Sequence, residues 1–383
     1  MDTWKCNNKA MIAMSGGVDS SVAAYLMLQQ GFECIGATMK LYDNPDIGLD
    51  EHHTCCSLSD VQDAKAVANH LGMDHFVYNF RERFEAWVIN RFIDSYKRGE
   101  TPNPCIDCNR YLKFSGLFRR ARELDCGYVV TGHYARVKRD EVSGRYLLQK
   151  AVDATKDQSY VLYTLTQAQL AHLLLPLGGY TKTEIREMAQ SEGFVNARKH
   201  DSQDICFVPG GDYAHFIEEK TGPSKPGHFV DPVGHILGEH KGIIHYTIGQ
   251  RRGLGIAFGT RMYVVDIDAE KNQVVVGNND DLRSAVVYAD RLNLISISEI
   301  TGPLRCKARL RYSMKEQPCT VTPLTEPIME SGSDSKASES PINPALKICV
   351  EFDEPQRAPT KGQALVLYDG DNVQGGGTIC GYE

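Results

Sequence analysis

The segment 13–21 carries the residue types of an anion-binding loop. It follows an apolar run and precedes a helical pattern, so its backbone amides would point from a helix N-terminus, where a phosphate is stabilised. Two central glycines let an anion approach the backbone closely. The hydroxyl groups of Ser15 and Ser20 add hydrogen-bond donors, and Asp19 can hold a magnesium ion that bridges phosphates. The spacing therefore predicts a nucleotide site.

The loop lacks the lysine of a Walker-type phosphate loop, which argues against transfer of a γ-phosphoryl group. Ser-Gly-Gly-Val-Asp-Ser between a strand and a helix instead resembles the pyrophosphate loop of enzymes that split ATP into AMP and pyrophosphate. Such enzymes adenylate an oxygen so that a nucleophile can displace it. Met39, Gly132 and His133 end later strands at the carboxyl edge of the sheet, where ligands bind in open α/β folds.

Three cysteines stand in polar settings where a thiol can react. Cys105 and Cys108 form a Cys-x-x-Cys pair before a helical pattern, and Cys206 follows another helix. A helix N-terminus and basic side chains can lower a thiol pKa, and the thiolate is the reactive form. The alternative is half of a zinc site, but a second Cys-x-x-Cys at zinc-ribbon spacing is missing.

The other cysteines favour packing over chemistry. Two histidines and two cysteines lie close together, but adjacent side chains point in different directions on any regular element, which argues against a metal site. These residues are His52, His53, Cys55 and Cys56. The remaining cysteines occur singly in apolar or strand contexts: Cys6, Cys34, Cys126, Cys306, Cys319, Cys349 and Cys380.

The pattern of the first half indicates an α/β fold. Apolar runs alternate with helical periodicity, which predicts a doubly wound, mostly parallel sheet with helices on both faces. The predicted strands are 11–14, 34–40 and 128–132, and the predicted helices are 20–30 and 59–71. A capping box at Thr181 and Glu184 opens a later helix.

The second half has a different character. From about Gly210 the chain is rich in Gly and Pro, and from about Tyr288 short strands alternate with turns, as in a small β-barrel or sandwich. We predict a catalytic ATP pyrophosphatase domain over 1–209, a small central domain over 210–285 and a β-barrel domain over 286–383. The polar stretch 325–343 predicts a disordered insertion.

Basic residues fall at every second position of one predicted strand. On a strand, these side chains would share one face while the residues between them pack inward. They are Arg305, Lys307, Arg309 and Arg311. Such a stripe can follow a phosphate backbone, and a solvated strand face is the alternative. A second basic region follows the Cys-x-x-Cys pair: Arg110, Lys113, Arg119, Arg120 and Arg122.

Composition sets further bounds. The 42 basic and 49 acidic residues give a net charge of -7, which argues against a protein dominated by phosphate contacts but allows a local basic groove. Twelve cysteines in 383 residues are far too few for a disulfide scaffold. No stretch resembles a signal peptide or a membrane helix. We expect a cytoplasmic protein with no membrane partner.

Several motifs together resemble the tRNA-specific 2-thiouridylases, over essentially the whole chain outside 325–343. The motifs are 14–20, 101–104 with Cys108 and Asn109, 131–136, 156–160, 201–207 and 246–255. The resemblance implies ATP and Mg²⁺ as cofactors, with ATP contacts from Ala13, Met14, Ser15, Gly16, Gly17, Val18, Asp19, Ser20, Met39 and Gly132. It implies tRNA contacts from the central domain and from Asn103, Pro104, Cys105, His133, Lys156, Asp157, Gln158, Arg311, Tyr312 and Gln363.

The resemblance also implies a reaction. ATP adenylates the C2 oxygen of the wobble uridine in certain tRNAs, and a persulfide on Cys206 delivers sulfur to C2. Cys108 serves as nucleophile, and a disulfide between Cys108 and Cys206 can form. The sulfur comes from a cysteine desulfurase, directly or through carrier proteins.

One residue departs from the family pattern, because many members have Asp where this chain has Cys105. Cys105, Cys108 and Cys206 together could ligate a four-iron cluster, [4Fe–4S], with one iron left open to carry sulfide. We favour the persulfide route, because it rests on the whole family. Two other functions stay open: an amidating ATP pyrophosphatase with an amine nucleophile, and an RNA-binding module with a decayed nucleotide loop.

Overall fold

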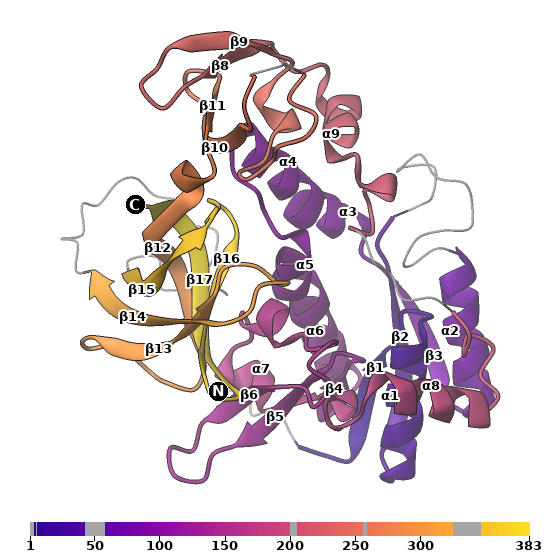
Figure 1. Cartoon of the computed structure of the whole chain (residues 1–383). Coiled ribbons are helices and arrows are strands. Elements are labelled where there is room, and N and C mark those ends of the chain that lie inside the picture. Colours follow the sequence, from indigo (N-terminus) through magenta and orange to yellow (C-terminus); the bar gives the residue numbers. More distant parts are fainter. Residues whose placement is uncertain (1–3, 5, 43–57, 200–204, 256–258, 325–345) are drawn as a thin grey trace. The chain divides into compact units, whose positions relative to one another are not determined.

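The computed structural model describes residues 4, 6–42, 58–199, 205–255, 259–324 and 346–383 (Figure 1). The chain forms two compact units. The first comprises Met1–Ile89, Pro104–Asp212 and Asp371–Val373, and the second comprises Asn90–Asn103, Tyr213–Gly370 and Gln374–Glu383. Across the described ranges, no helix is both long and apolar enough to span a membrane.

A parallel five-stranded sheet organises the first unit, in the order β3-β2-β1-β4-β7. Its strands are β1 (Lys9–Ala13), β2 (Glu33–Lys40), β3 (Asp74–Asn79), β4 (Tyr128–Val130) and β7 (Leu173–Leu174). The main helices are α1 (Val18–Gln29), α2 (Leu58–His70), α6 (Ser115–Glu123) and α8 (Lys182–Ser191). The α/β prediction is confirmed, and the predicted elements differ from the observed ones only by a few terminal residues.

Alternate residues of β1 face opposite sides of this sheet. Ala10 and Ile12 belong to a buried cluster with Val22 of α1, Ala64 of α2 and Ile185 of α8. Helix α6 contacts β1 and β4 and lies on the other side of the sheet (Figure 1). Burial on both faces explains why β1 has a continuous apolar run.

Shorter elements complete the first unit. The helical turns are α3 (Arg81–Phe84), η2 (Glu85–Ile89), α5 (Pro104–Asp107), η3 (Cys108–Phe114), η4 (Ser159–Leu162), α7 (Gln167–Leu170), η5 (Pro176–Gly179) and η6 (Pro209–Gly211). Strands β5 (Ala135–Arg139) and β6 (Tyr146–Lys150) form an antiparallel pair. Both η2 and η3 are π-helical, a widened geometry that is rare and often found at functional sites.

The second unit contains a four-stranded mixed sheet in the order β10-β11-β8-β9. These strands are β8 (Gly227–Val230), β9 (Ile236–His240), β10 (Tyr263–Asp268) and β11 (Gln273–Gly277). Helices α4 (Asn90–Lys97) and α9 (Tyr213–Thr221) belong to the same unit, together with the turns η7 (Ile243–His245) and η8 (Asp280–Leu282). The Tyr96 and Tyr213 rings stack with centroids 4.5 Å apart.

A closed six-stranded barrel forms the rest of this unit, in the order β12-β15-β14-β13-β16-β17, with β12 paired to β17. Its strands are β12 (Arg283–Leu294), β13 (Leu304–Arg309), β14 (Gln317–Leu324), β15 (Lys347–Arg357), β16 (Ala364–Asp369) and β17 (Asn372–Tyr382). Of the two predicted forms, barrel and sandwich, the barrel is present. The domain boundaries at 209 and 285 stay a prediction, and the insertion at 325–343 lies outside the described residues.

Candidate functional site

The predicted nucleotide loop connects β1 to α1 and packs on α2. Gly16 has a φ of 77°, and a Cβ atom there would lie 2.2 Å from the Asp60 carbonyl oxygen. Only glycine fits both the conformation and this close approach. The Met14 amide donates to the Ala37 carbonyl at 2.9 Å and ties the loop to β2.

Serine hydroxyls close the loop on itself. Ser20 Oγ accepts from the Ser15 amide at 3.2 Å and donates to the Gly17 carbonyl at 2.9 Å. Ser21 Oγ donates to the same carbonyl at 3.1 Å. These bonds set the loop shape before any ligand arrives.

A cavity of about 190 Å³ opens beside the loop. Most of the predicted ATP residues line it: Ala13, Met14, Ser15, Asp19, Ser20, Met39 and Gly132. His133 and Gln158, which the sequence assigned to tRNA, line the same cavity. Gly16, Gly17 and Val18 are in the loop but not among the lining residues. Lys113, from the second predicted basic region, also lines the cavity. The sequence analysis did not assign the other lining residues to a ligand: Ala37, Leu41, Leu117 and Thr131.

Gly132 lies directly against the loop. A Cβ atom at this position would be 2.9 Å from both the Asp19 carbonyl carbon and the Ser20 amide nitrogen. A side chain would therefore push α1 away from β4. This contact explains why glycine is required just after β4, which ends at Val130.

Asp19 is held by two side chains that the sequence analysis missed. Lys182 Nζ lies 2.7 and 2.8 Å from its two carboxylate oxygens, and the Tyr134 hydroxyl donates to Oδ1 at 2.7 Å. The predicted capping box is present, with Thr181 and Glu184 bonded reciprocally, and it places Lys182 at the first helical position of α8. The capping box was the one sequence pattern that could have placed Lys182 at the start of a helix. Asp19, which lines the cavity, is therefore in direct contact with a cation.

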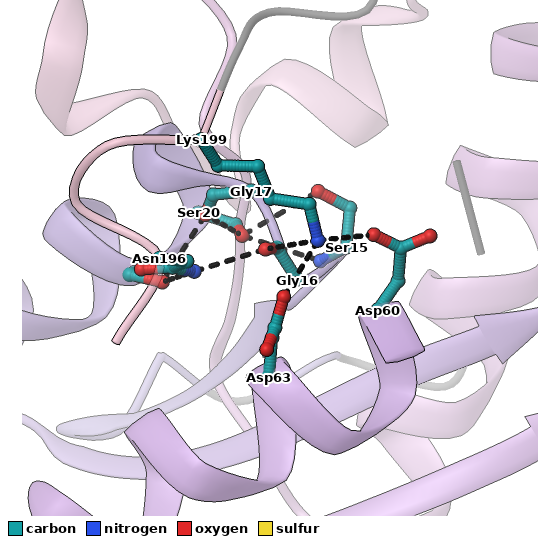
Figure 2. A network of polar contacts seen from close by, with 9 residues as sticks. Ser15, Gly16, Gly17, Ser20, Asp60, Asp63, Asn196 and Lys199 are labelled. Carbon is teal, nitrogen blue, oxygen red and sulfur yellow. Dashed lines mark hydrogen bonds and ion pairs between the residues drawn. The ribbon is translucent and has the colours of Figure 1, made fainter. Parts of the chain in front are cut away.

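A second lysine, Lys199, fastens the loop and is not among the residues that line the cavity (Figure 2). Lys199 Nζ lies 2.6 Å from oxygens of Asp60 and Asp63 and 3.5 Å from the Gly16 carbonyl. Burial lowers the pKa of Lys199, but hydrogen bonds to Asp60 and Asp63 outweigh it and raise the pKa above its ordinary value. Asn196 Nδ2 donates to the same Gly16 carbonyl and to Ser21 Oγ, both at 2.9 Å. The loop is thus bound to the chain segment that leads toward Cys206.

His133 is half-buried, and its ring is fixed by Thr131, whose hydroxyl lies 2.8 Å from Nδ1. Burial and, to a smaller extent, Lys113 lower the pKa of His133 to about 3, so the ring is neutral at neutral pH. Gln158 Oε1 accepts from the Tyr134 amide at 2.9 Å, which orients the amide group. A neutral imidazole and an oriented amide can recognise an uncharged polar ligand.

The predicted tRNA residue Asp157 is buried and holds a turn. Its Oδ1 accepts from the Ala151 and Ser159 amides at 3.1 and 3.2 Å, and Oδ2 accepts from the Ser159 hydroxyl at 2.9 Å. The neighbouring Lys156 is exposed to solvent only in part. Asp157 therefore positions the segment that presents Gln158.

The three candidate thiols differ in exposure. Cys105 on α5 is exposed, Cys108 at the start of η3 is buried, and Cys206 is half-buried. Helix η3 also places Lys113 at the cavity beside the nucleotide loop. Among the residues that the structure describes, no three Cys, His, Asp or Glu side chains converge as a metal site.

Turn α3 approaches both thiol segments. The Tyr42 hydroxyl donates to the Cys206 carbonyl at 3.2 Å, and the Phe84 ring of α3 packs against Tyr42 and Phe207, with centroids 5.9 and 5.6 Å away. Turn α3 also contacts η3, which begins at Cys108. The candidates His52, His53, Cys55 and Cys56 and the motif residues 201–204 lie outside the described residues.

Predicted tRNA residues of the second unit make contacts within that unit. Gln363 Nε2 donates to the Thr101 carbonyl at 2.9 Å, two residues before Asn103. Arg311 Nη2 donates to the carbonyls of Arg357 and Ala358 at 2.7 and 2.5 Å. Tyr312 is 44% exposed. Arg311 therefore holds a barrel loop in this structure.

The basic strand β13 has the predicted alternation, with Cys306 and Ala308 buried, but it ends at Arg309, so Arg311 is not part of the strand. Two of its cations are engaged with carboxylates: Arg305 pairs with Asp353, and Arg309 pairs with Glu316 at 3.1 Å. Lys307 is exposed. Neutralised arginines attract phosphate less than the sequence pattern suggests.

The prediction that the remaining cysteines pack singly is confirmed for only some of the buried ones. Burial raises the pKa of Cys34 to about 12 and that of Cys126 to about 11, so both stay protonated. Cys306 and Cys319 do not stand alone, because they face each other across β13 and β14 with sulfurs 3.8 Å apart. The sequence did not reveal this pair, since strand register depends on the fold.

Comparison with known proteins identifies the family. Three family models match, described as a tRNA methyl transferase HUP domain over residues 8–210, a tRNA methyl transferase PRC-barrel domain over 214–278 and an aminomethyltransferase beta-barrel domain over 329–379. The tRNA-specific 2-thiouridylase MnmA of Clostridioides difficile (strain 630) is 50% identical over 374 residues, covering 97% of this chain and 98% of the relative. This chain belongs to the tRNA-specific 2-thiouridylase family.

A second 2-thiouridylase supports the same assignment. The tRNA-specific 2-thiouridylase MnmA 1 of Thermoanaerobacter sp. (strain X514) is 51% identical over 377 residues, or 98% of each chain. The resemblance predicted from the sequence motifs is confirmed. Because the match covers both compact units, the nucleotide loop and the barrel both belong to the 2-thiouridylase architecture.

Proposed function

We propose that this chain catalyses ATP-dependent 2-thiolation of the wobble uridine in tRNA. The observation that carries the proposal is that one helix, η3, contains both a candidate reactive thiol and a residue that lines the cavity beside the nucleotide loop. Helix η3 begins at Cys108 and places Lys113 in the cavity lined by the nucleotide loop. A base bound at that cavity would lie beside ATP and against the helix that carries the Cys108 thiol.

The nucleotide loop binds the phosphates of the substrate ATP. Loop amides and the N-terminus of α1 stabilise their negative charge, and Lys182 adds a cation. Mg²⁺ fits the Asp19 carboxylate, since that group lines the cavity and already holds the Lys182 ammonium, and Mg²⁺ prefers oxygen ligands. When bound, Mg²⁺ would neutralise phosphate charge.

In the first step the C2 oxygen of uridine attacks the α-phosphorus of ATP, and pyrophosphate leaves. Neutral His133 and the oriented amide of Gln158 are placed to hydrogen-bond an uncharged base. The other tRNA contacts stay predictions: Asn103, Pro104, Cys105, Lys156, Asp157, Arg311, Tyr312 and Gln363.

In the second step the terminal sulfur of a Cys206 persulfide attacks C2, and AMP leaves. The Cys108 thiolate then attacks Sγ of Cys206 and breaks the sulfur–sulfur bond. The uridine keeps the transferred sulfur, and Cys108 and Cys206 are left as a disulfide, which an external dithiol reduces. A cysteine desulfurase or a sulfur-carrier protein reloads Cys206. This reaction takes place in the cytoplasm.

The test measures pyrophosphate and 2-thiouridine separately, with tRNA, ATP and a persulfide donor. Cys206→Ser and Cys108→Ser should still release pyrophosphate but should form no 2-thiouridine, because adenylation needs neither thiol. An amidating enzyme would retain full activity in both variants, and this outcome would overturn the proposal. An RNA-binding module with a decayed loop would release no pyrophosphate even as wild type.

Cys105 distinguishes the persulfide route from the iron–sulfur route. Cys105→Asp should retain thiolation if only Cys108 and Cys206 carry sulfur. A three-cysteine cluster would lose both its iron and its activity in this variant. Protein purified without oxygen should therefore be assayed for iron and acid-labile sulfide, together with thiolation by the Cys105→Asp variant.

A further inference from the structure

Two aromatic rings form an exposed stack beside the reactive helix. Trp87 of η2 is 41% exposed, and its ring stacks on Tyr111 of η3 with centroids 5.2 Å apart and planes 25° apart. Single exposed hydrophobic residues are common on protein surfaces. A stacked pair that leaves a large indole open to solvent is a more specific arrangement, because it presents a flat π surface.

A cation accompanies the stack. The Arg110 guanidinium carbon lies 5.8 Å from the Tyr111 ring centroid and 5.9 Å from that of Tyr163. Within the described residues, Nη2 of Arg110 is buried and has no hydrogen-bond partner. An aromatic face next to an arginine is a combination that binds single-stranded nucleic acid, since bases stack on the ring and the arginine adds a cation–π contribution.

The position along the chain links this stack to the reaction. Tyr111 follows Cys108 by three residues and precedes the cavity residue Lys113 by two, all on η3. An enzyme that modifies a base must take it out of the stacked loop, and its neighbours then lose a stacking partner. A protein ring can replace that partner.

We propose that Trp87 and Tyr111 form a stacking platform for an unpaired anticodon-loop base of the tRNA substrate. The proposal rests on the proposed function, because it takes tRNA as the ligand. A protein sulfur donor is the competing occupant of the same surface. Arg110 favours RNA as the occupant, because its guanidinium lies against the Tyr111 ring, and a base stacked on Trp87 would extend the Trp87–Tyr111 stack.

The chain offers a direct spectroscopic test, because it has two tryptophans, Trp4 and Trp87. Trp4 is held apart from the platform residues, with its ring stacked on His172 at 4.3 Å and its Nε1 donating to the Cys126 carbonyl. In Trp4→Phe, indole emission comes from Trp87 alone. Adding an anticodon stem-loop RNA should quench that emission, because stacked bases quench indole fluorescence.

The Trp87→Phe variant is the spectroscopic control. It retains Trp4, and its emission should not respond to the RNA. If Trp4→Phe does not fold, the difference between wild type and Trp87→Phe gives the Trp87 signal without it. Unchanged Trp87 emission at saturating RNA would overturn the platform.

Binding measurements test the energetic role. Trp87→Ala should weaken stem-loop affinity about tenfold, while Trp87→Phe should retain most of the affinity, because any flat ring can stack. The KM for tRNA should rise with kcat unchanged. Phe76→Ala on β3 is the matched control, since Phe76 is a 43% exposed aromatic residue on another element and should not affect binding.

Three outcomes would each contradict the stacking platform. If Trp87 only braces η2 against η3, Trp87→Ala will lower the thermal stability but leave the affinity unchanged, which overturns the proposal. If a sulfur donor protein quenches Trp87 and RNA does not, the surface belongs to that protein. If wild type neither binds nor thiolates tRNA, the proposed function itself fails.

Discussion

The nucleotide loop and the basic strand β13 show two ways to place polar groups. Loop groups are held from several directions: the Gly16 carbonyl alone accepts from Asn196 and Lys199, and Asp19 is held by Lys182 and Tyr134. On β13, Arg305 and Arg309 pair with nearby carboxylates, and Lys307 is exposed. Groups that must bind a ligand in one geometry need such support, whereas charges that attract RNA at a distance do not.

Gly16→Ala should have the largest effect. The added methyl group would lie 2.2 Å from the Asp60 carbonyl oxygen at a φ of 77°, so either the loop or α2 must shift. We expect a loss of roughly 2–4 kcal/mol of stability. Pyrophosphate release should fall by at least about a hundredfold, because the loop amides no longer face the phosphates.

Gly17→Ala is the matched control for that substitution. Gly17 has a φ of -89°, and its added methyl group would lie 3.5 Å from Ser15 Oγ, which is ordinary contact. Thermal unfolding should stay close to wild type, and pyrophosphate release should fall far less than in Gly16→Ala, because the loop keeps its shape. Equal damage from both substitutions would mean that packing on α2 does not set the loop shape.

Asp19→Ala should separate activity from folding. The substitution removes the proposed magnesium ligand and leaves Lys182, whose side chain is 11% exposed, without its carboxylate. We expect pyrophosphate release to fall about a hundredfold or more, as for a lost transition-state contact. The unfolding temperature should fall only modestly. Wild-type pyrophosphate release in this variant would exclude a role for Asp19 in binding the metal.

Lys199→Met should mainly reduce stability. It would leave the Asp60 side chain, which is 6% exposed, as a buried carboxylate without its cation, at a cost of roughly 2–3 kcal/mol. Because the folded-state pKa of Lys199 is raised, its contribution is complete below the ordinary value of about 10.5 and is lost as pH rises through the folded value.

Thermal unfolding from neutral pH to pH 11 checks this expectation. The stability difference between wild type and Lys199→Met should shrink above about pH 10.5. The double variant Lys199→Met with Asp60→Asn should recover part of the loss, because it removes the unpaired charge. A difference that does not change with pH would show that the lysine acts through packing.

Lys307→Ala should have the smallest effect. If this exposed lysine contacts a phosphate, tRNA affinity should fall a few-fold and the salt dependence should flatten by about one unit of slope. The unfolding temperature should not change. Arg311→Ala is the contrasting variant, because Arg311 bonds two loop carbonyls and its loss should lower stability as well.

The same contrast explains how far the sequence could predict the molecule. The loop from Ser15 to Ser20, the Thr181–Glu184 capping box and the alternation on β13 are local patterns, and each is present as predicted. Lys182 and Lys199 reach Asp19 and Asp60 from 163 and 139 residues away. No local pattern reports such distant contacts. The π-helical turns η2 and η3 likewise depend on packing, because helical periodicity does not distinguish a widened turn.

The closed barrel makes one region of the chain tolerant of added length. Leu324 ends β14 and Lys347 begins β15, and these two residues are paired directly in the antiparallel ladder. Both strands are also fixed by their other neighbours, β13 and β12. Because the entropy of closing a loop grows only logarithmically, doubling its length costs about 0.6 kcal/mol. A fluorescent domain or an affinity tag could therefore be inserted between these strands, which makes the barrel a practical attachment point for single-molecule work.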